Sequence, residues 1–346
     1  MKSIVLRIRG MLERRFATPR RVSLREAVAS EKRSGKHAQW TTAPTSAASR
    51  AAVLPMVKVV TVRDEGNNAH HALIDRHGRV IELRGNGCLP QHLSQADVAT
   101  PRTISQGIWI AEDWQGNYYH WLVRHLPKLM LFEGVDAPLV LPAHCGMQAV
   151  IDDTLDVLGW PRERRLYVDS PVTVIERGHI CQLADPDPQL VREVADRLRL
   201  SSNAGIRSAV FISRGAAASR RILNEPSLIE RLEETGVRAV RFEGARFQQQ
   251  RELMSGVTLL VGMHGAGLTN MMLMPAGGAV IEVMAGPAGG ATLYETLSRC
   301  LGHRYLRIPA TAQDANDRNS DVHVDIEEVV RDVKRLDNLS QRDSST

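Results

Sequence analysis

A glycine turn after a strand-like run holds the residues best suited to chemistry. The apolar run 257–261 leads into His264-Gly265-Ala266-Gly267, and a helix-like segment follows at 268–274. Two glycines within three residues let a ligand approach the backbone. The helix start would direct N–H groups and a positive dipole end at an anion. The pattern predicts a site for a phosphorylated ligand, and the alternative is a tight crossover whose histidine bonds only to local backbone.

Arginines follow an earlier strand-like run. Residues 210–212 lead into Ser213-Arg214, and Arg220 and Asn224 come next, before a helix expected at 226–234. Guanidinium groups bind phosphate oxygens through paired hydrogen bonds and stay charged at any physiological pH. The arrangement therefore predicts a clamp for a diphosphate. A solvated basic loop, with Asn224 capping the helix, is the alternative.

The order of these motifs resembles glycosyltransferase family 61. The motifs are Ser213-Arg214, Arg220, Asn224-Glu225, the turn from His264 to Asn270 and the run Val280-Ile281-Glu282-Val283, with Asn117-Tyr118-Tyr119-His120-Trp121 and Leu126-Pro127 upstream. They span about half the chain. The resemblance implies a GT-B-like α/β protein of two Rossmann-like domains that moves a sugar from a nucleotide sugar to a glycan. It does not identify the acceptor.

The candidate donor-binding residues come from the turn, the arginine loop and one strand end. They are Ser213, Arg214, Arg220, Asn224, His264, Gly265, Ala266, Gly267, Leu268, Thr269, Asn270 and Glu282. Glu282 ends an apolar run, where a carboxylate can accept hydrogen bonds from a ribose diol or pair with a nearby arginine. The Asn270 amide can bind a phosphate or sugar hydroxyl, or instead the helix start.

An inverting sugar transfer needs a base for the proton of the acceptor hydroxyl, and the first half of the chain offers three candidates. His120 lies on an expected helix capped by Asn117, and histidine can accept a proton near neutral pH. Glu112 and Asp113 follow a strand-like run and compete with it, and a core histidine held by a backbone carbonyl is the structural alternative.

Two further residues are assigned to the acceptor side together with Asn117. Arg124 follows His120 at the i+4 spacing and so shares its helix face. Tyr119 fits either packing or a platform for a sugar ring.

Strand-like and helical runs suggest four segments. Residues 1–52 read as a basic, poorly ordered arm, and 53–200 as an acceptor-side Rossmann-like domain. Regular alternation over 206–310 predicts a doubly wound parallel sheet that binds the donor at its carboxyl edge. Residues 311–346 form a loop and a helix, which the resemblance would pack back on the first domain.

Composition excludes several classes of protein. Of the 346 residues, 43% are hydrophobic and 24% charged, as in a soluble globular protein, and the net charge of +5 is too mild to indicate nucleic-acid binding. Four dispersed cysteines fit a reducing cytoplasm. No apolar run reaches the roughly 20 residues that span a bilayer. Residues 1–22 could lie on an anionic membrane face or have no role.

These features predict a cytoplasmic, metal-independent glycosyltransferase without a cofactor, using a nucleotide sugar, with UDP as the first choice, and a glycan or glycolipid acceptor. No paired Asp-x-Asp suited to a metal under a diphosphate stands out. A non-catalytic scaffold that binds nucleotide or glycan is one rival. A dinucleotide-dependent oxidoreductase is weaker, because Asn270 stands where the third glycine of its motif belongs.

Overall fold

The computed structural model describes most of the chain. It covers residues 20–342 apart from 36–37, 41–48, 66–67, 84–93, 95–98, 114, 145, 202–207, 216, 218, 286–291 and 318, with backbone only for 337–342. The chain divides into unit 1, residues 1–148 and 160–187, and unit 2, residues 149–159 and 188–346. The expected boundary near 200 therefore lies at 187. Helix α6 (Gln148–Val157), expected in the first domain, falls almost wholly in unit 2.

Unit 2 is built on a sheet that is parallel except at one edge. Its strands are β10 (Ser208–Ile212), β11 (Val237–Val240), β12 (Val257–Met263), β13 (Ala279–Ala285), β14 (Arg304–Ala312) and β15 (Val322–His323). Their order is β11-β10-β12-β13-β14-β15, and only β15 runs antiparallel to its neighbour. The chain thus turns back across the sheet between β10 and β12, which is the switch point where such folds bind ligands.

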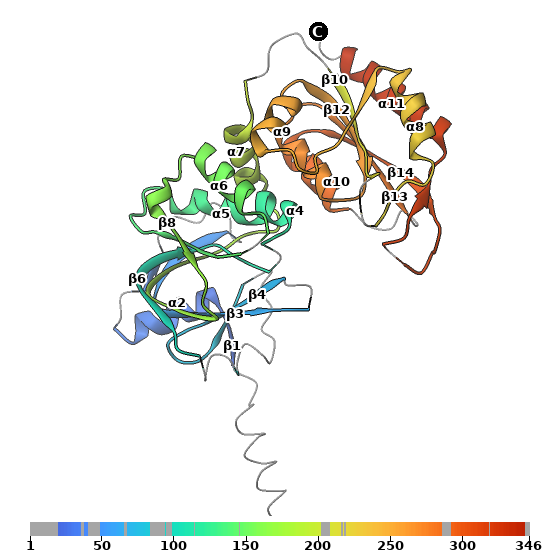
Figure 1. Ribbon diagram of the computed structural model, residues 1–346. Helices are drawn as coiled ribbons and strands as arrows, with labels where there is room; N and C mark the ends of the chain where they lie inside the picture. The colour runs from blue at the N-terminus through green and yellow to red at the C-terminus, as the bar shows by residue number, and fades with distance from the viewer. Residues whose placement is uncertain are drawn as a thin grey trace, which may run out of the picture. The chain divides into compact units, whose positions relative to one another are not determined.

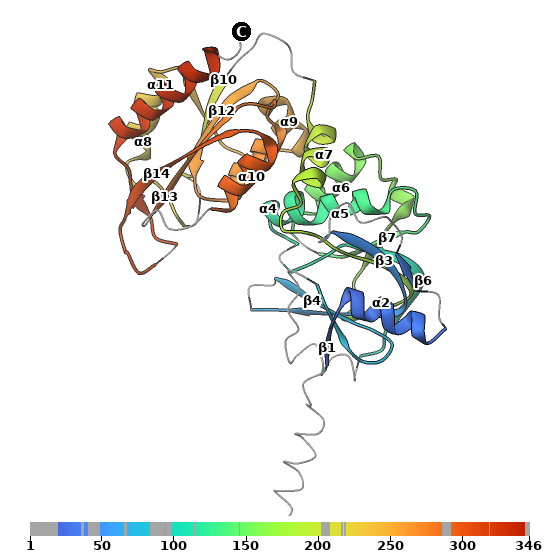
Figure 2. The same cartoon turned by 180° about the vertical axis from the view of Figure 1, so that it is seen from behind.

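Helices cover both faces of this sheet, as expected for a doubly wound domain (Figures 1 and 2). Besides α6, those of unit 2 are α7 (Pro188–Leu198), α8 (Glu225–Glu233), α9 (Phe247–Met254), η4 (Ala266–Leu273), α10 (Leu293–Leu301) and α11 (Ile326–Arg342). Helices α8 and α11 share one face, and α9 and α10 lie on the other. Helix α11, which the resemblance would pack back on the first domain, buries Val329, Val330 and Val333 in the core of unit 2.

Unit 1 contains a mixed sheet. Its strands are β1 (Arg21–Ser23), β2 (Gln39–Trp40), β3 (Arg50–Arg63), β4 (Ala69–Ile74), β5 (Val80–Glu82), β6 (Arg102–Trp109), β7 (Leu139–Pro142), β8 (Arg165–Val168) and β9 (Val172–Gln182). The order is β1-β5-β4-β3-β9-β6-β7-β8, with β2 on β3. Strands β9, β6, β7 and β8 are parallel, as in a Rossmann-like sheet, whereas β3, β4 and β5 are antiparallel. Short turns join β3 to β4 and β4 to β5, and such turns connect only antiparallel neighbours.

A continuous helical segment connects β6 to β7. It comprises α4 (Tyr118–His120), the π-helical turn η1 (Trp121–His125), α5 (Leu126–Leu129) and η2 (Met130–Phe132), and η3 (Arg162–Arg164) precedes β8. The expected helix over 118–132 is therefore present. Pro127 would meet the carbonyl of Val123 in a regular α-helix, and the wider turn just before it, in which Leu126 N bonds to Trp121 O, removes that conflict.

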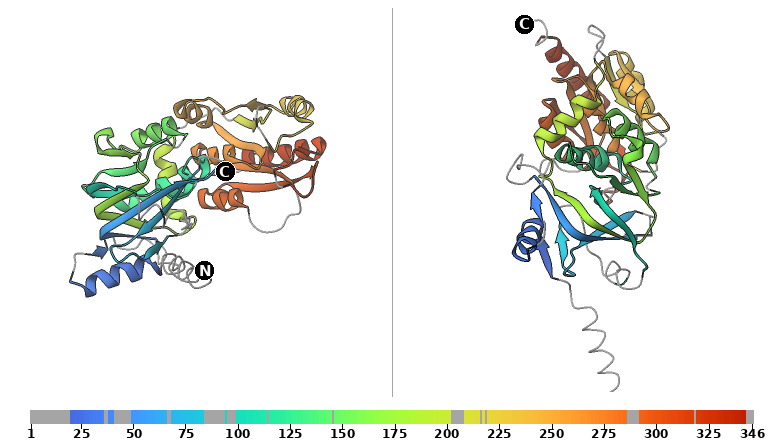
Figure 3. Two further views of the ribbon diagram at one scale, coloured as in Figure 1. Left: turned by 60° about the horizontal axis from the view of Figure 1, so that its bottom comes forward. Right: turned by 90° about the vertical axis from the view of Figure 1, so that its left-hand side faces the viewer.

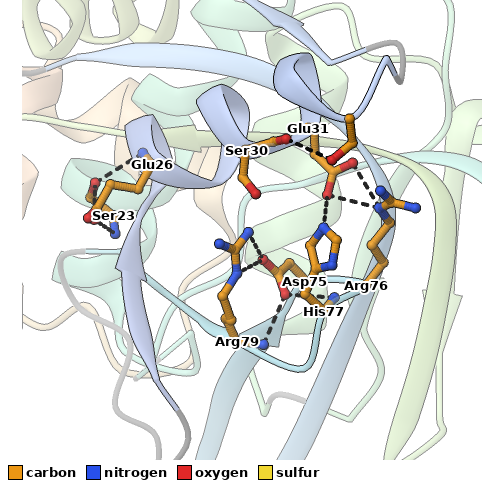
Figure 4. Close-up of polar contacts among 9 residues, drawn as sticks. Ser23, Glu26, Ser30, Glu31, Asp75, Arg76, His77 and Arg79 are labelled. Atoms are coloured by element: carbon orange, nitrogen blue, oxygen red, sulfur yellow. Dashed lines mark hydrogen bonds and ion pairs between the residues drawn. The ribbon is translucent and has the colours of Figure 1, made fainter.

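Part of the segment expected to be poorly ordered forms structure. Helix α2 (Leu24–Arg33) begins with a capping box in which Ser23 and Glu26 bond to each other's backbone N–H. Near its end the buried Glu31 accepts hydrogen bonds from Arg76 Nε, at 2.8 and 3.0 Å, and lies 3.0 Å from His77 Nε2 (Figure 4). Long-range pairing of this kind leaves no trace in local composition, which is why the expectation failed.

Helix α2 and the helical segment 118–132 lie on opposite sides of the sheet of unit 1 (Figure 3). Residues 1–19, which include most of the basic segment proposed to meet a membrane, lie outside the described part of the chain. Within the described part, no helix is long and apolar enough to cross a bilayer.

Candidate functional site

The carboxyl ends of β10 and β12 bring the arginine loop and the glycine turn together. Ile212, the last residue of β10, pairs with Gly262 of β12. Beyond the strands, the backbone carbonyl of His264 accepts a hydrogen bond from Arg220 Nη1 at 3.3 Å. A Cβ on Gly265 would collide with Arg214 Nη1. The guanidinium of Arg214 therefore lies directly over Gly265, in the space that a side chain at this position would occupy.

Arg214 is held by contacts at both of its ends. Its backbone N–H donates to Glu225 Oε1 at 2.9 Å, and Nη2 donates to the carbonyl of Ser219 at 2.9 Å. Burial lowers the pKa of the guanidinium, and the charge of Arg220 lowers it further. Its Nε is buried without a hydrogen-bond partner among the described residues. Such a cation is incompletely satisfied and favours an anionic ligand.

Arg220 occupies a backbone conformation that is unusual for its type. Its φ is 55°, in the left-handed region, where a residue with a Cβ is disfavoured by roughly 1–2 kcal/mol. Its backbone N–H bonds to Asn319 O at 3.1 Å, and this bond helps to hold the loop. Its buried Nε likewise has no partner within the described residues. Two half-buried cations with open donors thus converge on the same glycine turn.

The contacts of Glu282 differ from those expected of a carboxylate that binds a ribose. Its carboxylate is fully buried, with 0% exposure. Oε1 contacts His264 Nδ1, while Oε2 accepts hydrogen bonds from Thr292 Oγ1 at 2.7 Å and from the Tyr305 hydroxyl. Burial and the hydrogen bond to this carboxylate raise the pKa of Tyr305. The carboxylate is engaged on both oxygens, so it contacts the site through His264.

The turn itself packs tightly against β10. Gly265 has an extended φ of 169°, and the expected α-helix after it is the tighter 3-10 helix η4. A Cβ on Gly267 would lie 3.3 Å from Ile212 Cγ2. Asn270 Nδ2 donates to the carbonyl of Gly267 at 3.1 Å, and the Asn270 and Thr269 side chains are buried. These contacts favour the helix-start alternative for Asn270, and His264, Ala266 and Gly267 are the partly exposed residues of the turn.

Two other candidate donor residues have structural contacts. Ser213 is buried, and its hydroxyl accepts from Arg241 Nε at 3.4 Å. The amide of Asn224 donates to the carbonyl of Val324 at 2.9 Å and accepts from its N–H at 3.2 Å. It thus holds the segment before α11 instead of capping α8 with its side chain.

In unit 1, Asn117 caps the helix as predicted. Its side-chain oxygen accepts from the backbone N–H groups of Tyr119 at 3.0 Å and His120 at 3.3 Å. Burial lowers the pKa of His120 to about 4, the charge of Arg124 adds to this effect, and Asp185 opposes it. The imidazole is therefore neutral at physiological pH, which is the form a base requires. Tyr119 is buried, so it packs in the core and offers no platform for a sugar ring.

The two carboxylates that compete with His120 are already engaged. Glu112 is buried in an ion pair with Lys128, whose Nζ also donates to Ile110 O at 2.8 Å. The backbone N–H of Glu112 donates to His125 Nε2 at 3.0 Å. The structural role expected for His125 agrees with its burial, whereas Lys128 was not predicted, although a lysine in an apolar helical run was a signal that a buried partner exists.

Asp113 is bound by two neighbouring histidines. Its Oδ1 accepts from the backbone N–H of His71 at 3.0 Å, and its Oδ2 lies 3.2 Å from His70 Nδ1. Burial alone lowers the pKa of His70, but hydrogen bonds to Asp64 and Asp113 outweigh it, so the pKa is raised. Both carboxylate oxygens of Asp113 are therefore engaged by histidines, which makes Asp113 a poor candidate for the general base.

Arg124 is committed to a partner within unit 1. Its Nε donates to Asp185 Oδ1 at 3.1 Å, and Nη2 binds the other oxygen. The cavity that these two residues line together with Glu112 has a volume of about 10 Å³. That space fits a single water molecule and not a sugar. Among the described residues, no group of three or more His, Cys, Asp or Glu side chains could hold a metal ion.

Comparison with known proteins identifies relatives of this chain. The sequence model of the family Glycosyltransferase 61 matches residues 118–281. A curated protein of Drosophila melanogaster, the EGF domain-specific O-linked N-acetylglucosamine transferase, is 33% identical over 89 residues, which are 25% of this chain and 17% of that protein. The chain therefore spans less than a fifth of this relative. Both matches are to glycosyltransferases, and they confirm the resemblance predicted from the order of the motifs.

Proposed function

We propose that this chain, whose residues 118–281 match glycosyltransferase family 61, transfers a sugar from a nucleotide sugar to a glycan or glycoconjugate acceptor. The observation that carries the proposal is the pair of half-buried guanidinium groups, Arg214 and Arg220, over the glycine turn of unit 2. They lie at the switch point of a parallel sheet, where such folds bind nucleotides. We assign this unit to the donor, unit 1 to the acceptor, and a GT-B arrangement to the whole.

The charges at the turn suit a diphosphate without a metal ion. The diphosphate of a nucleotide sugar carries two negative charges, and the two arginines supply two positive ones. Guanidinium groups fixed before the reaction stabilise the charge that develops on the leaving nucleotide. We therefore propose metal-independent transfer, with UDP as the first nucleotide and N-acetylglucosamine, named in the relative, as the first sugar to test.

His120 is the base we propose for inverting transfer. Glu112 is engaged in an ion pair with Lys128, and Asp113 binds two histidines, so neither is a suitable proton acceptor. The neutral imidazole of His120 would take the proton of the acceptor hydroxyl as its oxygen attacks the anomeric carbon from the face opposite the leaving diphosphate. A chain that binds nucleotide but lacks a working base would instead be a scaffold.

We further propose a cytoplasmic location with peripheral membrane contact. The support is the basic, partly apolar composition of residues 1–22, which suits the surface of an anionic bilayer. Sedimentation of the full chain with phosphatidylserine vesicles, compared with phosphatidylcholine vesicles, tests the contact.

The deciding experiment measures nucleotide binding and transfer separately. UDP should raise the melting temperature of the purified chain in EDTA, and Arg214→Ala should remove that shift. His120→Ala should bind UDP like the wild type and yet lose transfer from UDP-N-acetylglucosamine or another UDP-sugar to a glycan mixture. Binding with no transfer in the wild type would favour the scaffold. A shift with NAD and none with UDP or GDP would refute the transferase proposal.

A further inference from the structure

A buried carboxylate lies directly behind the proposed diphosphate site. Glu282 sits on β13 in register with Gly262 of β12, and β12 separates it from β10, the strand that leads to Arg214. It is 0% exposed, and a carboxylate removed from water at this depth needs several donors to offset lost hydration. Those donors come from three different elements: His264 after β12, Thr292 before α10 and Tyr305 on β14.

This network fixes the imidazole of His264. Nδ1 is bound to Glu282, the backbone N–H donates to Val283 O at 2.8 Å, and the Tyr294 ring packs edge-on at 5.3 Å. The side chain remains 24% exposed. Nε2 makes no hydrogen bond to the described residues. The ring therefore has one nitrogen held by the interior and one left for a ligand.

The two arginines flank the same residue. Arg220 donates to the backbone carbonyl of His264, and Arg214 covers the adjacent Gly265. We infer that Glu282 is a positioning residue that holds His264 so that its Nε2–H binds the diphosphate of the donor, as a third cationic contact beside the two arginines. This inference rests on the proposed function, because it assigns a role within the same donor site.

The chemistry requires the imidazole to carry both protons. One N–H then donates to Glu282 and the other to a phosphate oxygen, so that each ring nitrogen has an anionic acceptor. During transfer, the bond between the anomeric carbon and the phosphate oxygen breaks, and its electron pair stays on that oxygen. The acceptor oxygen forms the new bond, and its proton goes to the base. His264 stabilises the leaving group by hydrogen bonding and is not consumed.

Isothermal titration with UDP and NMR titration with uridine test this role, since uridine lacks the diphosphate. Glu282→Gln keeps the shape of the side chain but removes its charge. We expect it to weaken UDP binding by about tenfold or more, as for loss of a hydrogen bond to a charged group, and to leave uridine binding unchanged. His264→Ala should show the same pattern. The double variant should bind UDP no more weakly than His264→Ala, because the two substitutions remove the same contact to the diphosphate.

A second variant covers the case in which Glu282→Gln does not fold. Tyr305→Phe removes one donor and keeps the carboxylate, so it should weaken UDP binding several-fold only when His264 is present. In ¹⁵N spectra of labelled histidine, the His264 Nε2 signal of the wild type should shift on adding UDP and lose that shift in the Glu282 or Tyr305 variant.

Three results would overturn the inference. These are wild-type affinity for UDP in the Glu282 and Tyr305 variants, equal losses of UDP and uridine binding, and additive losses in the double variant. Equal losses would mean that the network only supports the fold. Failure of the wild type itself to bind UDP, GDP or ADP would instead reject the donor site, and this outcome is recognised before any variant is made.

Discussion

Replacing Gly265 with alanine tests how the glycine turn and the arginine loop work together. The backbone at Gly265 is extended, so an alanine can adopt its conformation without strain. The new methyl group, however, would occupy the position of Arg214 Nη1. The far end of a flexible side chain gives way more easily than the backbone, so we expect the guanidinium to be displaced while the fold is retained.

The expected effects on stability and on binding differ in size. Displacement breaks the 2.9 Å bond from Nη2 to Ser219 O, which contributes about 0.5–1.5 kcal/mol. That loss corresponds to a fall in melting temperature of about 2–4 °C per kcal/mol for a domain of this size. The loss of a charged contact to phosphate should cost about 1.5–3 kcal/mol, or about 10- to 150-fold in UDP affinity.

Calorimetric titration with UDP and thermal unfolding of the same samples measure both quantities. Gly262→Ala is the matched control, because its methyl group would meet Ile212 and Leu268 at 3.3 Å and no arginine. Overpacking should cost that variant about 1–3 kcal/mol of stability with little change in UDP affinity. Gly265→Ala combined with Arg214→Ala should bind UDP no more weakly than Arg214→Ala. Wild-type affinity in Gly265→Ala, or additive losses, would refute the reasoning.

Two predictions concern stability. Lys128→Met leaves the buried carboxylate of Glu112 without its cation and should lower the free energy of unfolding by about 3–5 kcal/mol. Adding Glu112→Leu should restore much of that free energy. Urea denaturation measures both variants, and a Lys128→Met variant as stable as the wild type would contradict this prediction. Burial, with a smaller contribution from Arg199, lowers the pKa of His303 to about 4. The unfolded histidine titrates near 6.5, so the unfolded state binds more protons between these values and stability should fall as the pH drops from about 6.5 to 4, by at most about 1.4 kcal/mol per pH unit. His303→Gln should lessen the difference in unfolding free energy between pH 7 and pH 5, and an unchanged difference would show that His303 makes no such contribution.

Local patterns predicted the fold where neighbouring segments in the sequence are also neighbours in space. The alternation of strands and helices after residue 206 produced the parallel sheet of unit 2, because each crossover returns the chain to the same sheet. The helix at 118–132 and its Asn117 cap were predicted for the same reason. Unit 1 was predicted less well, since the contact of α2 with the turn between β4 and β5, made by Glu31, joins residues far apart in the chain.

Residue types and their spacing were enough to predict the chemistry of the candidate site: strand-end arginines, a glycine turn and a histidine followed by a strand with one acid. Residue type and spacing suffice for that, because strand ends and glycine turns are local features. Which donor groups remain without a partner depends on the folded chain. Folding buries Glu282 against His264 and pairs Glu112 with Lys128. It also directs the Asn224 amide to the backbone of Val324 and leaves the guanidinium groups of Arg214 and Arg220 half-buried at the turn. Burial and partners depend on distant strands, which is why composition and spacing could not reveal them.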